Sequence, residues 1–293
     1  MELNTEVVTT PPRPAATVVL LRDGAQGLEA FLLRRHGASD VLGGVYVFPG
    51  GKLDAADSGP ALAARLDQEP EALHAALGEP DTDAGMAAGL FVAALREAFE
   101  ECGVLFAESA AGHAVDTARA AALLREGLSF GELLAGLALR LQTRALLPWS
   151  RWITPRQPSI TNKRFDTRFF VAALPPGQTA QHDDHETTDS VWLAPRAALE
   201  QYRDGQIDMI APQIMSLAHL ARHASVASVL EAARLRPPPL IEPQPFEEDG
   251  MRVICYPGDP RHPVRERALP GPTRLCFRNK RFEPMQGFDE LLG

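Results

Sequence analysis

Three glutamates stand close together at the end of an apolar segment. The chain reads AGMAAGLFVAALREAFEECG from Ala84 to Gly103, so Glu97, Glu100 and Glu101 follow an uncharged stretch. At about 100° per residue in an α-helix, the three carboxylates fall within an arc of about 100°. Carboxylates that crowd in this way repel one another, and Mg²⁺ prefers such oxygen ligands while keeping waters that a phosphate can replace. The spacing therefore indicates a place for a divalent cation beside a phosphorylated ligand.

A purely structural explanation of the same glutamates is also open. Arg96 can pair with Glu100 at i, i+4, and the remaining carboxylates can be solvated, with each such pair contributing only about 0.3–0.5 kcal/mol. The opposite side of the helix is apolar and can pack against a sheet; it carries Phe91, Val92, Leu95, Phe99 and Cys102. On either explanation the helix begins near the capping side chains of residues 81–83 and ends at Gly103.

The elements that must position this helix predict a mixed α and β fold. The stretch ATVVLLRDGAQGLEAFLLRR, from Ala16, reads as a β-hairpin, and VYVFPGG reads as a strand that ends at a Pro-Gly-Gly loop. Further strands are expected at SRWIT, RFDTRFFVAAL and SVWLA, followed by a helix over 207–235 and a terminal pair of strands at MRVICY and TRLCF. The order of strands and helices indicates an α+β fold or an α/β sandwich.

The segment REAFEECGV, preceded by FPGG, resembles the Nudix hydrolase signature. That signature is Gly, five residues, Glu, seven residues, Arg-Glu, an aliphatic residue, any residue, Glu-Glu, any residue, Gly and an aliphatic residue. Counted from Gly51, the first glutamate falls at Asp57, and the Arg-Glu pair begins at 96, which is 31 residues later than the expected position 65. VFPGGKLDAAD, RFDTRFFVAAL and VWLAP resemble the peroxisomal coenzyme A diphosphatase branch, so the resemblance covers roughly residues 15–200.

The resemblance implies the Nudix fold, in which a mixed β-sheet lies between α-helices. We expect a flexible N-terminus over 1–14 and a Nudix domain over 15–235, followed by a C-terminal extension over 236–293 that packs on the same domain. Helical insertions are expected at about 58–88 and 116–143. The segment 58–88 is predicted to be an ordered cover beside the site, because it is Ala-rich and splits the signature. The segment 116–143 is interpreted as an insertion or a lid.

The resemblance also implies metal-dependent hydrolysis of a diphosphate bond that links a nucleotide to another group. The expected ion is Mg²⁺ or Mn²⁺, which neutralises the phosphate charge and lowers the pKa of the attacking water. Its implied ligands are Glu97, Glu100, Glu101 and the carbonyl of Gly51, while Arg96 orients a glutamate. Coenzyme A or an acyl derivative is the leading substrate. The alternatives are an ADP-ribose or nucleotide-sugar diphosphatase and a catalytically silent ligand sensor.

The loop HDDHETTDSVWL holds further candidates. Glu186 follows a spacing that many Nudix enzymes show before the last central strand, where a loop glutamate acts as a base or as an extra metal ligand. A solvated acidic turn explains the same residues equally simply. His182 and His185 resemble half of a metal motif, but no Cys or His cluster completes it, so we interpret them as loop residues.

Basic residues and glycines complete the candidate site. Lys163, Arg164 and Arg168 can hold phosphates, or they can be the exposed residues of a strand whose alternate positions are buried. Gly50 and Gly51 suit a tight turn next to the substrate and the metal, because the backbone there has no Cβ hindrance.

Composition and charge narrow the classes of partner. A formal net charge of −9 disfavours a nucleic acid polymer, since such partners are usually met by a basic surface. Cys102, Cys255 and Cys276 lack metal-type spacing and are expected to be unreactive thiols in a reducing compartment. Because no signal pattern or membrane span is recognised in the sequence, we expect a cytoplasmic protein that acts on a small diphosphate compound, with a homodimer as a compatible assembly.

Overall fold

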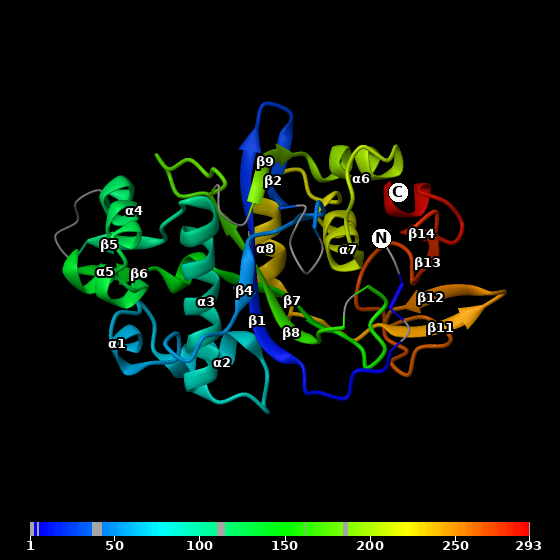
Figure 1. Cartoon of the computed structure of the whole chain (residues 1–293), viewed down its shortest axis with the longest axis horizontal. Coiled ribbons are helices and arrows are strands. Elements are labelled where there is room, and N and C mark those ends of the chain that lie inside the picture. The colour runs from blue at the N-terminus through cyan, green and yellow to red at the C-terminus, as the bar shows by residue number, and fades with distance from the viewer. Residues whose placement is uncertain are drawn as a thin grey trace.

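A mixed eight-stranded β-sheet lies between two layers of helices (Figure 1). The computed structural model describes residues 3–4, 6–36, 43–109, 115–160, 162–183 and 187–292. The strands of this sheet are β1 (Arg13–Gly24), β2 (Gly27–Arg35), β3 (Tyr46–Val47), β4 (Gly50–Lys52), β7 (Leu147–Ile153), β8 (Phe165–Ala173), β9 (Thr187–Leu193) and β10 (Leu240–Ile241). The fold is therefore of the α+β class that the sequence predicts, with a mixed sheet between helices.

Strand β1 is the centre of the sheet. It pairs in parallel with β8 and antiparallel with β2 and β4, and the predicted hairpin turns between Gly24 and Gly27. Along β1, Val18 and Leu20 pack in the core that contains α3 (Ala84–Cys102), whereas Val19 and Leu21 pack in the core on the other face. A strand that is buried on both faces reads as a continuous apolar run, which explains the stretch TVVLL.

Helix α3 carries the three glutamates and has the ends that the sequence predicts. The Asp83 side chain accepts a hydrogen bond from the Met86 amide at 2.7 Å, which caps the first turn. Gly103 adopts a left-handed φ of 69° after the last turn, where a residue without Cβ is preferred. Phe91 packs on Phe170 of β8 with a 4.7 Å separation between ring centroids, so the apolar side of α3 faces the sheet.

The insertion that splits the signature is ordered and packs on α3. It contains α1 (Pro60–Ala63) and α2 (Pro70–Leu77), and its side chains Leu62, Leu66 and Leu73 are buried. Glu79, which follows α2, binds Arg168 of β8 through both carboxylate oxygens at 2.5 and 3.0 Å. The insertion is therefore tied to the sheet by an ion pair as well as by apolar packing.

The second insertion forms a small lobe at the other end of α3. It contains α4 (Thr117–Arg125) and α5 (Phe130–Gly136), next to the two-stranded pair of β5 (Ala107–Ser109) and β6 (Leu139–Leu141) and the short 3₁₀ turn η1 (Thr143–Ala145). Phe130 lies near Phe99 of α3, with ring centroids 6.2 Å apart. This lobe extends the apolar core beyond the end of the helix.

The opposite layer contains α6 (Pro195–Arg203), α7 (Ala211–Leu220) and α8 (Val226–Leu235). The helical segment expected over 207–235 consists of two helices: α7 ends at Leu220, and the Ser225 side chain caps α8 by accepting from the Ser228 amide at 3.3 Å. Within the described part of the chain, no helix is both long and apolar enough to cross a membrane.

The C-terminal extension packs on the same body. Strand β10 pairs with β7, and four antiparallel strands form a separate sheet beside α6 and α7 (Figure 1). These strands are β11 (Gln244–Glu248), β12 (Met251–Cys255), β13 (Arg274–Arg278) and β14 (Arg281–Pro284), and the short helix α9 (Asp289–Leu292) follows them. Ile254, Leu275 and Phe282 belong to the core on this face of the main sheet. The predicted strand pair at MRVICY and TRLCF is confirmed.

A buried histidine lies in this second core. His219 of α7 is 8% exposed and packs on Trp149 with ring centroids 4.4 Å apart. Burial, reinforced by the charges of Arg236, His223 and Arg222, lowers the pKa of His219 to about 3. Since Arg236 Nη2 lies 3.4 Å from His219 Nδ1 and can only donate, the neutral ring is the form that fits.

Replacing His219 by Asn should remove part of the acid sensitivity of the fold. In the unfolded chain the pKa of histidine is about 6.5, so below this pH the unfolded state takes up the proton and the stability contributed by neutral His219 is lost. Lowering the pH from 7 to 5 should cost the parent about 2 kcal/mol more free energy of unfolding than it costs His219→Asn. Urea unfolding of both proteins at both pH values checks this, and equal losses would contradict it.

Candidate active site

The glutamate face of α3 borders a cavity of about 660 Å³. Strand β4 and the loop after it form one wall, and the starts of β1 and β8 form another. The described residues that line the cavity are Arg13, Ala15, Thr17, Arg35, Val47, Phe48, Gly50, Gly51, Lys52, Asp54, Arg96, Glu97, Glu100, Glu101, Lys163, Phe165, Thr167, Asp183 and Gln213. The structure thus brings the three glutamates and both glycines of the prediction to one place.

The two glycines of FPGG allow β4 to lie close to β1 and to Glu97 of α3. A Cβ atom on Gly51 would lie 2.2 Å from Glu97 Oε1, and one on Gly50 would lie 2.5 Å from the Ala16 carbonyl oxygen. The Gly50 amide donates to Glu101 Oε2 at 2.8 Å. Gly50 is therefore required by the close approach of β1, and the absence of a side chain on Gly51 leaves room for the Glu97 carboxylate.

Arg96 holds the acidic groups in place. Its Nη1 donates to Glu97 Oε1 and to Glu100 Oε2, both at 2.8 Å. Its Nε and Nη2 donate to the two carboxylate oxygens of Asp57 at 2.9 and 3.0 Å, and Nη2 also donates to the Lys52 carbonyl at 3.1 Å. The guanidinium group thus fixes two of the three glutamates relative to β4, and this arrangement fits the orienting role that the resemblance implies.

Asp57, at the position where the signature counts its first glutamate, contacts Arg96 from the other side of the insertion. The sequence left its equivalence open, because the insertion separates it from the Arg-Glu pair. Its carboxylate is nevertheless buried, with 2% exposure, and forms the bidentate pair with Arg96. The pair therefore joins the segment after FPGG to the Arg-Glu segment of α3, although residues 58–88 separate them in the sequence.

Burial governs the protonation of the glutamates. Desolvation raises the pKa of Glu97 to about 6, although Arg96 opposes the shift. The pKa of Glu100 is raised for the same reason, again against the effect of Arg96. Burial by itself would lower the pKa of Arg96, but the hydrogen bond with Asp57 and the charges of the surrounding carboxylates together raise it. Arg96 therefore stays positively charged, and its single charge partly compensates the carboxylates of Asp57, Glu97 and Glu100.

The donor set suits a hard divalent cation. Glu97, Glu100 and Glu101 line the same cavity as Gly51, and oxygen is the donor that Mg²⁺ and Mn²⁺ prefer. Among the described residues, however, no three acidic, imidazole or thiol groups lie together as a ready-made ion site. The reason is that Glu97 and Glu100 contact Arg96, while Glu101 contacts the Gly50 amide. A cation would have to take over part of these contacts.

The predicted basic residues separate into two kinds. Lys163 lines the cavity. Arg164 does not: it is 7% exposed, and its Nε donates to the Thr154 carbonyl at 2.9 Å. Arg168 lies in the core of β8 and is engaged by Glu79 and Asp166. The structure therefore contradicts the prediction that Arg164 and Arg168 bind substrate, because groups of the protein itself occupy their guanidinium groups.

The acidic loop before β9 is only partly described. Glu186 and His185 lie outside the described residues, so the predicted role of Glu186 stays a prediction. Asp183, in the same loop, lines the cavity. His182 has a ring nitrogen 2.9 Å from Ser190 Oγ, as expected for a loop residue.

Three cations in the cavity were missed in the sequence: Arg13, Arg35 and Lys52. Strand β1 starts at Arg13 and β2 ends at Arg35, so the predicted hairpin already places both residues at the same end of the sheet. Arg35 Nε is buried and has no hydrogen-bond partner among the described residues. In contrast, no described residue of 58–88 or 116–143 lines the cavity. The first segment is therefore ordered, as predicted, but does not cover the site, and for the second segment an insertion fits and a lid does not. Both insertions pack on α3 without reaching the cavity.

The bidentate pair between Asp57 and Arg96 should be essential for stability. Asp57→Asn keeps the shape but removes the charge that faces a buried guanidinium, and the expected loss is about 3 kcal/mol in the free energy of unfolding. Asp54→Asn is the matched control, because Asp54 has a 63% exposed side chain and lies 3.7 Å from the same guanidinium. It should cost no more than about 0.5 kcal/mol. Urea unfolding measures both, and similar small losses would show that Asp57 does not hold Arg96.

Comparison with known proteins agrees with this geometry. The model of the NUDT19 Nudix domain matches residues 8–220. The acyl-coenzyme A diphosphatase NUDT19 of Xenopus laevis is 26% identical over 231 residues, which cover 68% of this chain and 61% of the relative. The human protein of the same name is 29% identical over 259 residues, which cover 76% of this chain and 66% of the relative. The chain thus spans slightly less than two thirds of each of these relatives.

A solved structure supports the same assignment. The crystal structure of a Nudix hydrolase from Alicyclobacillus acidocaldarius aligns with a TM-score of 0.63 and 27% identity, and the alignment covers 76% of this chain and 97% of that one. The match of a family model over most of the chain, the shared fold and the assembled signature lead to one conclusion: the chain belongs to the Nudix hydrolase family, in its NUDT19-like branch.

Proposed function

We propose that the chain hydrolyses the diphosphate bond of a nucleoside diphosphate linked to another group. The observation that carries this proposal is the position of Glu97, Glu100 and Glu101 against Gly50 and Gly51 in a single cavity. The same cavity is lined by several cationic side chains, namely Arg13, Arg35, Lys52 and Lys163. Acidic groups on one side and basic groups on another suit a ligand whose phosphates are held directly by cations and also through a metal ion.

Different residues of the cavity would bind the phosphates, align the glutamates and hold the metal ion. Arg35 and Lys163 would bind phosphate oxygens and so orient the diphosphate. Arg96 keeps Glu97 and Glu100 aligned without itself needing to touch the substrate. Glu97, Glu100, Glu101 and the Gly51 carbonyl would hold Mg²⁺ or Mn²⁺, which when bound supplies charge neutralisation and a more acidic water. Positioning and electrostatic stabilisation are the main demands of phosphoryl chemistry.

Glu100→Gln and Glu101→Gln test the metal-site assignment. Each change keeps the size of the side chain but removes a ligand charge, so turnover should fall at least about a hundredfold, as for the loss of one group that stabilises the transition state. Glu126→Gln is the control, because Glu126 has a 58% exposed side chain and does not line the cavity. It should hydrolyse at the parent's rate.

A second measurement separates loss of metal from loss of fold. Mg²⁺ at about a hundredfold excess over its Kd should stabilise the parent by about 2.7 kcal/mol, since it binds only the folded state. The melting temperatures of the two cavity variants should respond less to Mg²⁺ than those of the parent and the control. Glutamine variants that keep both the parent's turnover and its Mg²⁺ response would falsify the assignment.

Coenzyme A or an acyl-coenzyme A is the substrate we propose, supported by the names of the Xenopus laevis and human relatives. Incubation with coenzyme A and Mg²⁺ should release 3′,5′-ADP and 4′-phosphopantetheine, which mass spectrometry identifies. The competing substrate is ADP-ribose, which shares the adenosine diphosphate part. A kcat/KM more than about tenfold higher for ADP-ribose, about 1.4 kcal/mol of transition-state binding, would contradict the proposed substrate.

A further inference from the structure

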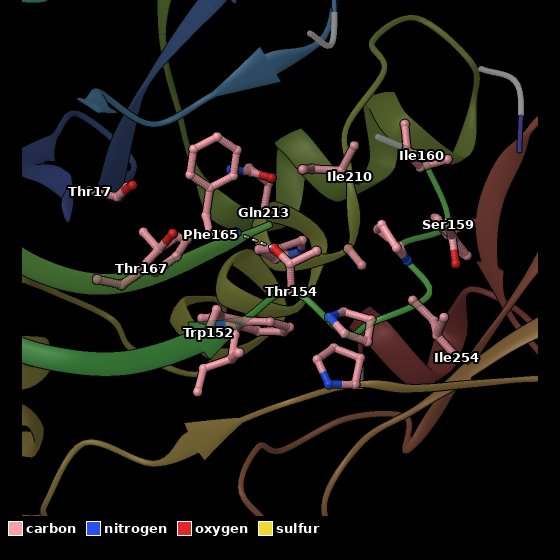
Figure 2. Close-up of a pocket in the computed structure, with 18 residues that line it drawn as sticks. Thr17, Trp152, Thr154, Ser159, Ile160, Phe165, Thr167, Ile210, Gln213 and Ile254 are labelled. Atoms are coloured by element: carbon pink, nitrogen blue, oxygen red, sulfur yellow. Dashed lines mark hydrogen bonds between the residues drawn. The ribbon is translucent and has the colours of Figure 1, made fainter. Parts of the chain in front are cut away.

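A second, smaller cavity of about 230 Å³ lies beside the candidate active site (Figure 2). It is formed where β7 and β8 meet the loop 154–160, the start of α7 and the C-terminal extension. Most of its lining is apolar: Trp152, Ile153, Pro155, Pro158, Ile160, Phe165, Phe169, Ile210, Ala211, Pro212, Pro243, Ile254 and Phe282. The remaining described lining residues are Thr17, Thr154, Ser159, Thr167 and Gln213, so none of the described lining carries a charge.

The two cavities share a wall. Thr17, Phe165, Thr167 and Gln213 line both the acidic cavity and the apolar one. In Figure 2, Gln213 and Phe165 stand toward Thr17, while Ile160 and Ile254 stand at the other end of the pocket. The two cavities are therefore direct neighbours across these four side chains, which places the second cavity next to a diphosphate bound in the first.

Gln213 leaves an acceptor at this junction. The side chain is 6% exposed, and its Oε1 is buried without a hydrogen-bond partner among the described residues. Ser159, which lines the apolar pocket, likewise has a buried Oγ without a hydrogen-bond partner among the described residues. Buried polar atoms are nearly always paired, because an unpaired one costs stability. An N–H or O–H group on a ligand would satisfy Gln213 at the place where both cavities meet.

We propose that the apolar pocket holds the non-nucleotide arm of the substrate, an apolar chain that carries an N–H or O–H donor for Gln213 Oε1. The inference rests on the proposed function for the position of the diphosphate. It adds the chemical class of the group beyond the diphosphate: an amide-bearing or hydroxyl-bearing aliphatic arm, as in an acylated pantetheine, is accepted, and a free sugar is not.

The lining favours an aliphatic arm over a purine base. A purine carries several polar nitrogen atoms around its edge, and a pocket built mainly from isoleucine, proline and aromatic side chains would leave most of them unpaired. An acyl chain buries no polar atom except its thioester oxygen, and the amide and hydroxyl groups of the arm that carries it can meet Gln213, Ser159 and the threonines of the lining. A sugar such as ribose would lose more hydrogen bonds to water than the pocket can replace.

The C-terminal extension supplies part of this pocket. Pro243, Ile254 and Phe282 come from the chain beyond residue 220, where the match to the NUDT19 Nudix domain ends. The extension is therefore placed to decide which group is accepted beside a diphosphate site that is built from the matched part of the chain.

Two variants and two controls test the pocket. Ile160→Asp places a charge in the apolar cavity, away from the acidic one, and Gln213→Leu removes the acceptor at nearly constant size. The controls are Leu235→Asp and Gln206→Leu, which introduce the same two residues, Asp and Leu, at exposed positions outside both cavities. Far-UV circular dichroism and the melting temperature verify that each variant folds. Gln213→Leu should melt no lower than the parent, since it removes an unpaired buried acceptor.

The readout that needs no hydrolysis is calorimetric binding of S-hexanoyl-pantetheine, which has neither nucleotide nor diphosphate. The parent and both controls should bind it with the same Kd, while Ile160→Asp should raise the Kd at least about tenfold and Gln213→Leu about fivefold. No binding by the parent, or equal Kd values throughout, overturns the proposal. If binding behaves as expected but no diphosphate is hydrolysed, the proposed function fails and the pocket assignment stands.

The kinetic readout decides which part of the substrate occupies the pocket. With hexanoyl-coenzyme A, Ile160→Asp should lower kcat/KM at least about tenfold, and with ADP-ribose it should change kcat/KM less than about twofold. If both substrates lose rate in parallel, the pocket holds the adenosine part that they share, and the proposal is overturned.

Discussion

The guanidinium group of Arg96 is the interaction on which the arrangement of the site depends. Its side chain is 11% exposed, and a charge in such a position is tolerated only when its donors are satisfied. Asp57, Glu97, Glu100 and the Lys52 carbonyl satisfy them. Because these partners come from two segments far apart in the sequence, the pairing fixes β4 and the following loop against the last turns of α3. The insertion between those segments can therefore be long without altering the cavity.

The other arginines show how a fold separates structural cations from binding ones. Arg168 and Arg151 both contact Glu79, and Arg168 lies in the core of a central strand, so their charges are compensated internally. Arg35 differs, because its Nε is buried beside the cavity and is unpaired among the described residues. A ligand anion gains most from a cation whose donors are still available, since no existing pair must be broken first.

The sequence was informative where local rules decide the structure. Asp83 and Gly103 predicted both ends of α3, and the Gly-Gly pair of β4 predicted a backbone without Cβ hindrance beside the glutamates. It was uninformative where a partner lies far along the chain. Nothing near Arg168 indicates that Glu79 neutralises it. The pattern around Gln213 predicts an apolar helix, so the burial of its unpaired Oε1 is visible only in the folded structure.

The junction at Gln213 separates two kinds of recognition. In the proposed function the acidic cavity would bind its ligand through charge, and because every diphosphate carries similar charge, it would discriminate weakly among the groups attached to it. The neighbouring pocket contains no charge among its described lining and excludes ligands by leaving their polar atoms unpaired, which discriminates strongly. Since the extension forms one side of that pocket, changes in β12 and β14 can alter substrate choice while Arg96 and the glutamates stay as they are. The residues that select the attached group are therefore largely different from those that would bind the diphosphate.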